Sequence, residues 1–288
     1  MINQYKRLDV FSCNYQSHAR FENKVSVYHV LKARNCYPHG CIYFKWKCKL
    51  FNKGKRCIKG FNYVGKKCVN CSYYTDIKIH SQPKINLDPA AYQQFTEELQ
   101  LFEDWLFDIE NHTINFMGTI DVVKPRLQKE IQGNEHSLKL VGFTLIFREA
   151  YFDLMHYEDL CYVNISPAMQ QKVRFAEGDE IEFQAIVQLD RGRIILNRLR
   201  NIEFITRSDN RIWTVSDALV VKQTATVFAQ QLPGCLSCAH GVLVDVADFS
   251  GRKPAKKREL YCLKGTKDPD VCIHLLPVEI LDNERTCP

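Results

Sequence analysis

The sequence predicts a mainly β protein of the α+β class, in which one long helix leads into a five-stranded barrel and small cysteine-rich modules flank them. Three observations predict this fold class. The chain has 288 residues, enough for two or three domains. Of its 13 cysteines, six fall within residues 36–71 and four within residues 235–272. Between these clusters the hydrophobic pattern changes from helical periodicity to strand alternation.

The N-terminal module, residues 1–87, carries most of the positive charge. It has 17 Lys and Arg against three acidic residues, an excess of +14, whereas the whole chain has a net charge of +6. Within it, aromatic side chains alternate with Lys and Arg, a combination that single-strand-binding proteins use to stack bases and neutralise phosphates. The pattern predicts nucleic-acid contacts at Trp46, Lys53, Lys55, Arg56, Lys59 and Phe61.

The cysteines of this module are spaced as two half-sites for a metal ion. The candidate ligands are Cys36, Cys41, Cys57, Cys68 and Cys71. Four of them would close the site, as either 36/41/68/71 or 41/57/68/71, which leaves Cys13 and Cys48 spare. A closed thiolate site predicts structural Zn²⁺, although four thiolates also suit a [4Fe–4S] cluster. Metal is favoured over disulfides because the cysteine count is odd and the first thirty residues lack the pattern of an export signal.

Residues 88–112 are predicted to form an acidic amphipathic helix that links this module to the centre of the chain. Asp88 and Pro89 supply an N-cap and a first helical residue. Apolar side chains then recur at helical spacing, at Phe95, Leu99, Phe102 and Leu106. The segment has seven acidic residues and no Lys or Arg. These carboxylates are interpreted as a solvated face, or as a dock for the basic module, rather than as catalytic groups.

Residues 113–206 are predicted to form five strands, with a short helix around 167–175 after the third. A Gly-Asp turn at 178–179 precedes the fourth strand, and a turn at Arg191-Gly192 joins it to the fifth. The strand count, the position of the helix and the GDEIEF entry to strand four resemble an OB-fold, a five-stranded Greek-key barrel. The resemblance implies a binding face on strands two and three for oligonucleotides, oligosaccharides or proteins. Loops between strands one and two and between strands four and five would frame it.

Basic residues on or near this face are the expected nucleic-acid contacts of the barrel. They are Lys124, Arg126, Lys139, Arg148, Arg191 and Arg193. The segment has 11 Lys and Arg against 13 acidic residues, a net charge of −2, so few phosphate contacts are expected there. The alternative is a barrel that only holds the two cysteine modules together.

Residues 207–288 contain the most regular cysteine motif. Cys235 and Cys238 have the C-x2-C spacing that lets two thiolates grip one ion, and Gly241 can take the positive φ that such a turn often needs. Two strand-like segments follow, and Cys262 and Cys272 would complete four thiolates. The arrangement resembles a zinc ribbon, although its second pair is spaced C-x9-C. Substitutes for the fourth ligand are His240, His274 and Cys287.

The sequence lacks the motifs of common enzymes: there is no GxSxG, no phosphate-binding P-loop and no HExxH. The pattern as a whole predicts a cytoplasmic, nucleoid-associated or nuclear protein that binds nucleic acid without catalysis, most simply single-stranded or structured DNA or RNA. It predicts two structural zinc sites and no membrane span. The alternatives are a scaffold that docks onto a larger protein complex, an iron–sulfur enzyme or a metal-dependent nuclease.

Overall fold

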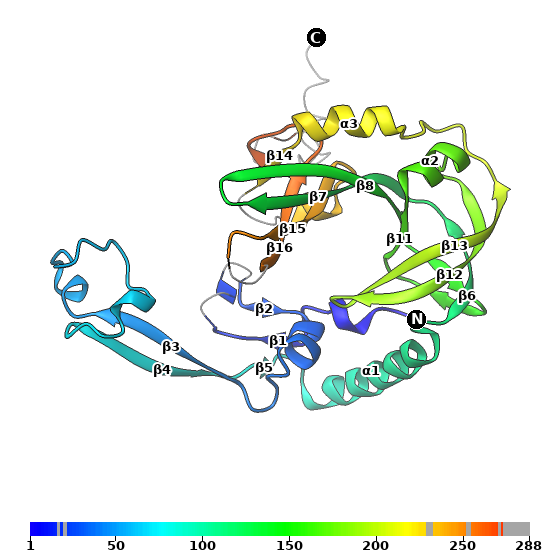
Figure 1. Ribbon diagram of the computed structural model, residues 1–288. Coiled ribbons are helices and arrows are strands. Elements are labelled where there is room, and N and C mark those ends of the chain that lie inside the picture. The colour runs from blue at the N-terminus through cyan, green and yellow to red at the C-terminus, as the bar shows by residue number, and fades with distance from the viewer. Residues whose placement is uncertain (16–17, 20–21, 229–232, 252–254, 270–271, 273–288) are drawn as a thin grey trace, which may run out of the picture. The chain divides into compact units, whose positions relative to one another are not determined.

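The computed structural model describes residues 1–288 except 16–17, 20–21, 229–232, 252–254, 270–271 and 273–288 (Figure 1). The protein is mainly β with few helices, as predicted. It divides into two compact units. The smaller unit is Asn3–Glu103, and the larger unit is Met1–Ile2 with Asp104–Pro288.

The smaller unit contains two separate antiparallel sheets. In the first, β1 (Phe11–Ser12) lies between β2 (Lys24–Val25) and β5 (Lys84–Ile85). In the second, β3 (Cys41–Cys48) pairs along its whole length with β4 (Tyr74–Ser81). The short helical turns are η1 (Gln4–Lys6), η3 (His29–Ala33), η4 (Phe51–Lys53) and η5 (Lys66–Cys68).

The β3–β4 ribbon ends in a segment of turns, residues 49–73, which we call the tip (Figure 1). The tip has no strand or α-helix, and all its residues are described. None of the residues from 41 to 80 is buried. The ribbon and its tip are therefore held together without an apolar core of their own.

Helix α1 (Pro89–Ile109) begins where the sequence predicts, because the Asp88 carboxylate accepts hydrogen bonds from the backbone N–H groups of Ala90 and Ala91, each at 3.0 Å. The four apolar residues that recur along it, from Phe95 to Leu106, are buried. The boundary between the two units falls within this helix.

The larger unit is built on one sheet of eleven strands, in the order β10-β9-β6-β12-β13-β11-β8-β7-β15-β16-β14. The longer strands from the predicted barrel segment are β6 (Thr113–Thr119), β7 (Val122–Gln132), β8 (Glu135–Phe147), β11 (Cys161–Ile165), β12 (Glu180–Asp190) and β13 (Arg193–Thr206). We call these six the central strands. The others are β9 (Ala150–Phe152), β10 (Met155–Tyr157), β14 (Thr226–Phe228), β15 (Gly241–Asp248) and β16 (Ala255–Cys262). The helices are α2 (Pro167–Val173), in the predicted place after the third predicted strand, α3 (Val215–Thr224) and α4 (Pro233–Ser237).

The predicted closed barrel is not found: the first predicted strand is divided into two strands, β6 and β7, and the sheet continues beyond both of them, from β6 to β9 and from β7 to β15. At the break, the N–H of Ile120 donates to Asp179 before β12, whereas the N–H of Asp121 donates to Ile146 of β8. The chain therefore changes its pairing partner between residues 120 and 121. Before this point β6 pairs with β12, and after it β7 pairs with β8. The far edge of β7 pairs in parallel with β15. The sheet consequently continues into the C-terminal strands instead of closing.

Strands β15 and β16 form an antiparallel pair, the C-terminal hairpin. Its apolar side chains Val242, Val244 and Tyr261 pack with Leu127 of β7 in one buried cluster. A second buried cluster contains Cys235, Cys262, Leu260 and Phe228. The C-terminal cysteines thus lie beside an extended apolar core.

Candidate functional site

A groove of about 550 Å³ runs over the larger unit. Its lining comes from five of the central strands and from both strands of the C-terminal hairpin. On β11 the side chains alternate, so that Cys161 and Val163 are buried while Tyr162 and Asn164 line the groove. Other polar groups in the lining are Gln128, Thr144, Gln188 and Asn197. The groove therefore lies on the outer, polar face of the central strands, and the second and third predicted strands, β8 and β11, contribute Thr144, Tyr162 and Asn164 to it.

The groove is strongly basic, although the predicted barrel segment is slightly acidic. It contains six Lys and Arg against two Asp, an excess of four positive charges. The basic residues are Arg126, Arg191, Arg193, Lys256, Lys257 and Arg258, and the acidic ones are Asp190 and Asp245. Hairpin residues supply half of the positive charge. The central strands alone would not attract an anion as strongly.

Both acidic groups of the groove are paired with Arg258. Its Nε donates to Asp245 at 2.8 Å, and its Nη2 forms a very short contact with Asp190. Burial on its own would raise the pKa of Asp190, but the hydrogen bond and charge of Arg258 lower it below the usual range. Arg193 adds a weaker contact to Asp190, at 3.4 Å, and lies 5.2 Å from the centre of the Tyr162 ring. The charges of Arg258 and Arg193 are therefore largely used in contacts within the groove and are less available to a ligand.

Arg126 and Arg191 are the predicted contacts that keep donors available. The Nε of Arg126 is buried and has no hydrogen-bond partner among the described residues. Its Nη2 donates weakly to the backbone oxygen of Val141, at 3.4 Å. Burial lowers the pKa of Arg126, and the charge of nearby Asp245 opposes this shift. Arg191 is exposed on the turn between β12 and β13, where its φ is +52°.

The other predicted contacts of the barrel lie outside the groove. Arg148 lines a separate hollow of about 540 Å³, where its Nε is 2.9 Å from Asp121. Lys139 is paired with Glu130 at 2.6 Å on the surface. Lys124 is buried, so it cannot reach a ligand. Of the six barrel residues predicted from the sequence, the structure brings Arg126, Arg191 and Arg193 together.

Lys124 instead stabilises the turn that follows the first C-terminal cysteine pair, Cys235 and Cys238. Its Nζ donates to the backbone oxygens of Cys238, at 2.6 Å, and Gly241, at 2.9 Å. Burial lowers the pKa of Lys124, and the charges of Cys238 and Asp121 oppose that shift. A buried ammonium with two carbonyl partners fixes the path of this turn.

Three of the predicted C-terminal ligands, Cys238, Cys262 and Cys272, lie near the fourth, Cys235. Burial raises the pKa of Cys235 above its usual value, and the proximity of Cys238, Cys272 and Cys262 adds to the shift. Of the possible substitutes, His240 uses its backbone N–H to donate to Cys238 Sγ at 3.4 Å. His274 and Cys287 lie outside the described residues.

Gly241 is needed here for a different reason from the one expected. Its φ is not positive, but a side chain would collide with the backbone, since a Cβ would lie 1.7 Å from the Cys235 oxygen. Its N–H donates to the Cys238 oxygen at 3.1 Å, which closes the turn. The Cys262 oxygen accepts in the same way from Gly265, at 3.2 Å, and there φ is +74°.

The N-terminal cysteines fall into two groups, and the division differs from both predicted ligand sets. Cys36 lies near Cys41 and Cys13, and burial followed by these neighbours raises its pKa to about 11. Cys41 begins β3 and Cys48 ends it, so seven residue steps of about 3.3 Å, roughly 23 Å, separate them. The predicted ligands Cys57, Cys68 and Cys71 line a small cavity at the Cys48 end. Cys36 and Cys41 are therefore too far away to join them, and Cys48, considered spare, takes their place.

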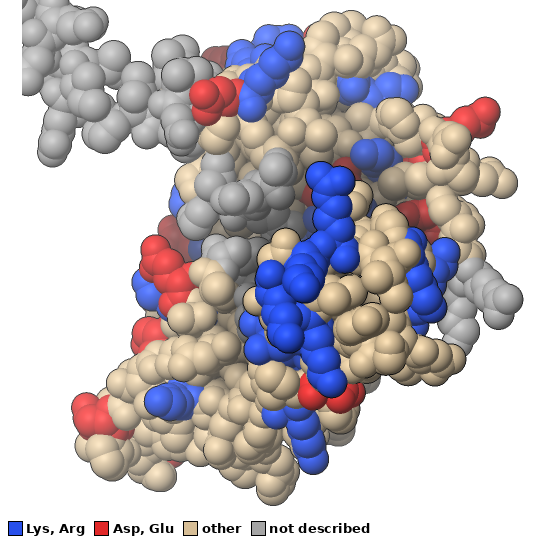
Figure 2. All heavy atoms as spheres, turned by 90° about the vertical axis from the view of Figure 1, so that its left-hand side faces the viewer, with Lys and Arg blue, Asp and Glu red and all other residues tan. Residues whose placement is uncertain are grey.

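The predicted basic contacts of the N-terminal module are exposed on the tip, at Lys53, Lys55, Arg56 and Lys59. Figure 2, drawn from the left-hand side of Figure 1, shows a dense group of Lys and Arg side chains. Trp46 is 39% exposed on β3. Phe61, in contrast, lines the cysteine cavity. The two predicted stacking residues therefore have different surroundings, one facing solvent and one facing sulfur.

Sequence reasoning missed the hairpin side of the groove. The sequence feature that could have indicated it is the run of three basic residues at Lys256, Lys257 and Arg258. It was missed because the parallel pairing of β15 with β7 is what carries the run to the central strands. Cys48 was missed because the spacing of cysteines does not show which end of a strand each occupies.

Among the described residues, no group of three or more His, Cys, Asp or Glu side chains is positioned as it stands to hold a metal ion. No described helix combines the length and the apolar character that crossing a membrane requires. Comparison with protein-family models, curated proteins and solved structures finds no match to this chain.

Proposed function

We propose that this protein binds single-stranded nucleic acid, DNA or RNA, in the basic groove of its larger unit, and that it does so without catalysis. One observation carries the proposal: the groove combines an excess of four positive charges with a polar floor that includes Tyr162, Asn164 and Asn197. Lys and Arg neutralise phosphates, while amides and an aromatic ring can contact bases. Such a role would be performed in the cytoplasm, at the nucleoid or in the nucleus.

The strand order supports an OB-like architecture for this surface. The central strands run β6-β12-β13-β11-β8-β7, and β11 pairs with β13 in parallel. With β6 and β7 taken as halves of one first strand, this is the order 1-4-5-3-2-1. Strands two and three contribute Thr144, Tyr162 and Asn164 to the groove, and Arg191 is on the turn between strands four and five. The groove therefore overlaps the binding face that the OB-fold resemblance implies, and this overlap supports the proposal.

Arg126 gives the proposal a specific anion-binding group. Arg126 lines the groove, and among the described residues its guanidinium makes only a weak hydrogen bond, to the Val141 oxygen at 3.4 Å, so it can offer its charge to a phosphate in the groove. We further propose that Cys235, Cys238, Cys262 and Cys272 hold a structural Zn²⁺, which would fix the hairpin that supplies Lys256, Lys257 and Arg258. The metal would have no part in chemistry, since four thiolates leave no open coordination position.

A second candidate function, docking onto a larger protein complex, is favoured by the ribbon. Ile42, Phe44 and Trp46 share one face of β3, and their exposed fractions are 55%, 55% and 39%. Exposed apolar side chains in a row are typical of protein contact surfaces. This function would use a different surface from the groove, so the two candidates can be separated by mutation.

The decisive experiment measures the affinity of the full chain for labelled single-stranded DNA, single-stranded RNA and duplex DNA over a series of salt concentrations. With about four phosphate contacts, the logarithm of affinity for a single strand should fall against the logarithm of salt with a slope of about −3. The triple variant Arg191→Ala, Lys256→Ala, Lys257→Ala should bind at least about tenfold more weakly and flatten the slope by about 2.

The matched control removes three positive charges from the same unit outside the groove, with Arg148→Ala, Lys172→Ala and Arg211→Ala. Its affinity should stay within about threefold of the parent protein, because surface charges beyond a Debye length are screened. Equal losses in both triple variants would make binding nonspecific and refute the groove. The absence of salt-dependent binding by the intact chain would favour the docking function.

A further inference from the structure

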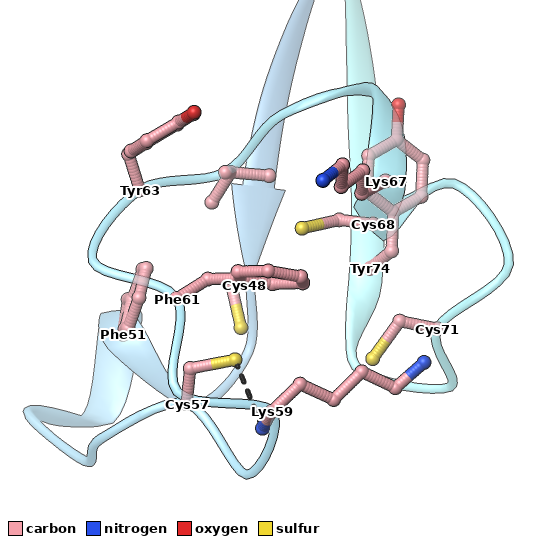
Figure 3. Close-up of a pocket in the computed structure, with 11 residues that line it drawn as sticks. Cys48, Phe51, Cys57, Lys59, Phe61, Tyr63, Lys67, Cys68, Cys71 and Tyr74 are labelled. Atoms are coloured by element: carbon pink, nitrogen blue, oxygen red, sulfur yellow. Dashed lines mark hydrogen bonds between the residues drawn. The ribbon is translucent and has the colours of Figure 1, made fainter.

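Four cysteines of the smaller unit line one small cavity (Figure 3). Cys48 ends β3, Cys57 lies in the turns of the tip, Cys68 ends η5, and Cys71 precedes β4. In Figure 3 the sulfur atoms of Cys48 and Cys57 face each other, and those of Cys68 and Cys71 point inward from the opposite side. Three separate parts of the ribbon and tip, around Cys48, Cys57 and the pair Cys68 and Cys71, therefore present thiols to the same space.

We propose that Cys48, Cys57, Cys68 and Cys71 bind one Zn²⁺ ion that holds the tip folded. This ligand set differs from those that the cysteine spacing suggests, and the proposal is independent of nucleic-acid binding by the groove. On binding, the four thiols release four protons to solvent, and the resulting Zn²⁺ site has a net charge of −2.

The size of the cavity favours a single ion over a cluster. Its volume is about 20 Å³. One water-sized particle needs about 10–15 Å³, so the space suits an ion with its ligands around it and not four irons with four sulfides. Around the sulfurs, Phe51, Phe61 and Tyr74 provide an apolar wall that limits the access of water.

The charges around the cavity suit a site of net charge −2. Lys59 and Lys67 both line it. Two ammonium groups at the edge of the site would balance the charge left by four thiolates and one divalent ion. A backbone hydrogen bond also suits a negatively charged sulfur, since the N–H of Lys59 donates to Cys57 Sγ at 3.4 Å.

The turn at Cys57 repeats the turn at Cys238. In both, the N–H two residues later donates to the cysteine sulfur at 3.4 Å. In both, the N–H of the glycine three residues later donates to the cysteine oxygen at 3.1 Å, from Gly60 and from Gly241. Backbone N–H groups directed at sulfur stabilise a thiolate over a thiol. The two turns therefore prepare their cysteines for the same ligand chemistry.

The tip also needs a source of stability that its side chains do not provide. No residue from 41 to 80 is buried, although this segment is fully described. A segment of this size without an apolar core requires disulfides or a metal to remain folded. All four cysteines are free thiols in the structure.

The four thiols surround the cavity, but they do not converge on one point, since no three of them are placed to hold an ion as they stand. Closing the site takes side-chain rotation and small movements of the turns that carry Cys57, Cys68 and Cys71. These turns lie outside any regular sheet or α-helix, so they can make that adjustment.

The test is zinc content per chain, measured by elemental analysis of the full-length protein and single Cys→Ser variants. Replacing Cys48, Cys57, Cys68 or Cys71 should each remove about one equivalent of zinc. The matched controls Cys36→Ser and Cys41→Ser, in the same unit, should remove none. Loss of zinc from the Cys41 variant together with retention in the Cys48 variant would overturn the ligand set, and iron with sulfide in place of zinc would overturn the metal.

A second measurement avoids variants that fail to fold. The rate at which each cysteine of the native wild-type protein is alkylated is followed by mass spectrometry, with and without a strong zinc chelator. The four cavity cysteines should react at least about tenfold faster after chelation, because metal-bound thiolates are shielded. Equal rates with and without chelator at these four positions would overturn the proposal.

Discussion

The two cysteine groups proposed to bind metal use similar turns in opposite surroundings. At the C-terminal group, Cys235 and Cys262 are buried, and strands β15 and β16 continue a sheet of eleven strands. At the N-terminal group, the four cysteines are only partly buried and lie at the end of an isolated two-stranded ribbon.

This difference shows how much of each site the protein supplies without metal. The C-terminal group is supported by apolar clusters, by strand pairing to β7 and by the buried Lys124. The tip has its own backbone turns, and its side chains are exposed or half-exposed. We therefore expect metal to add stability at the C-terminal group and to be required for folding in the tip.

The largest expected effect is on hydrogen exchange after metal removal. Incubation of the full chain with a strong zinc chelator should raise the exchange rates of amides in residues 49–73 by about 100-fold or more, because these turns open once their ligands are free. Amides of β15 and β16 should change by less than about tenfold, because the strand ladder and apolar clusters remain. Hydrogen exchange read by mass spectrometry resolves both segments in one sample.

A comparable loss of protection in both segments would show that the C-terminal hairpin also depends on metal for its fold. No change in the tip would show that its turns are stable without any ion. Repeating the exchange after zinc is restored provides the control, since recovered protection separates metal removal from irreversible damage.

An intermediate effect is expected from Lys124, which distinguishes the C-terminal group from the tip. Lys124→Met keeps the apolar stem but removes both donors from the oxygens of Cys238 and Gly241. Losing two charge-assisted hydrogen bonds to buried carbonyls should lower the free energy of unfolding by about 2–4 kcal/mol. Urea unfolding followed by circular dichroism measures this value.

The matched control is Lys139→Met, which breaks an exposed pair with Glu130 and should cost less than about 1 kcal/mol. Similar costs for the two variants would mean that Lys124 does not support the turn.

The sequence predicts the parts of this molecule that are set by local chemistry. The Asp88-Pro89 start of α1 and the turn at Gly178-Asp179 are examples, since each is determined by a few adjacent residues. The C-x2-C spacing at Cys235 and Cys238 belongs to the same class. Such features can be predicted from the sequence because the residues that determine each of them are adjacent in the chain.

The parts that sequence did not predict depend on register and pairing over long distances. Cys41 and Cys48 are both close to Cys57 in sequence, and only the length of β3 shows that they lie at opposite ends of a strand. The role of Lys124 depends on contacts 114 and 117 residues away. The groove likewise requires the pairing of β15 with β7, which no local pattern in either strand indicates.

The smallest expected effect concerns the ion pair that ties the C-terminal hairpin to the central strands. Asp190 of β12 contacts Arg258 of β16, and this contact lowers the pKa of Asp190 in the folded protein. Because the folded pKa lies below that of the unfolded chain, the stabilisation is present above about pH 4 and is lost as the pH falls through the folded pKa. Asp190→Asn should therefore lower the free energy of unfolding by up to about 1 kcal/mol at pH 7, and the difference from wild type should shrink toward pH 3. Urea unfolding at several pH values tests this, and comparison of the two proteins at each pH cancels any acid release of metal that affects both alike.

Asp209→Asn, at an exposed carboxylate of the same unit, is the control and should leave the dependence of the unfolding free energy on pH unchanged. A pH-independent difference for Asp190→Asn would mean that Asp190 supports the hairpin through hydrogen bonds that do not depend on its ionisation.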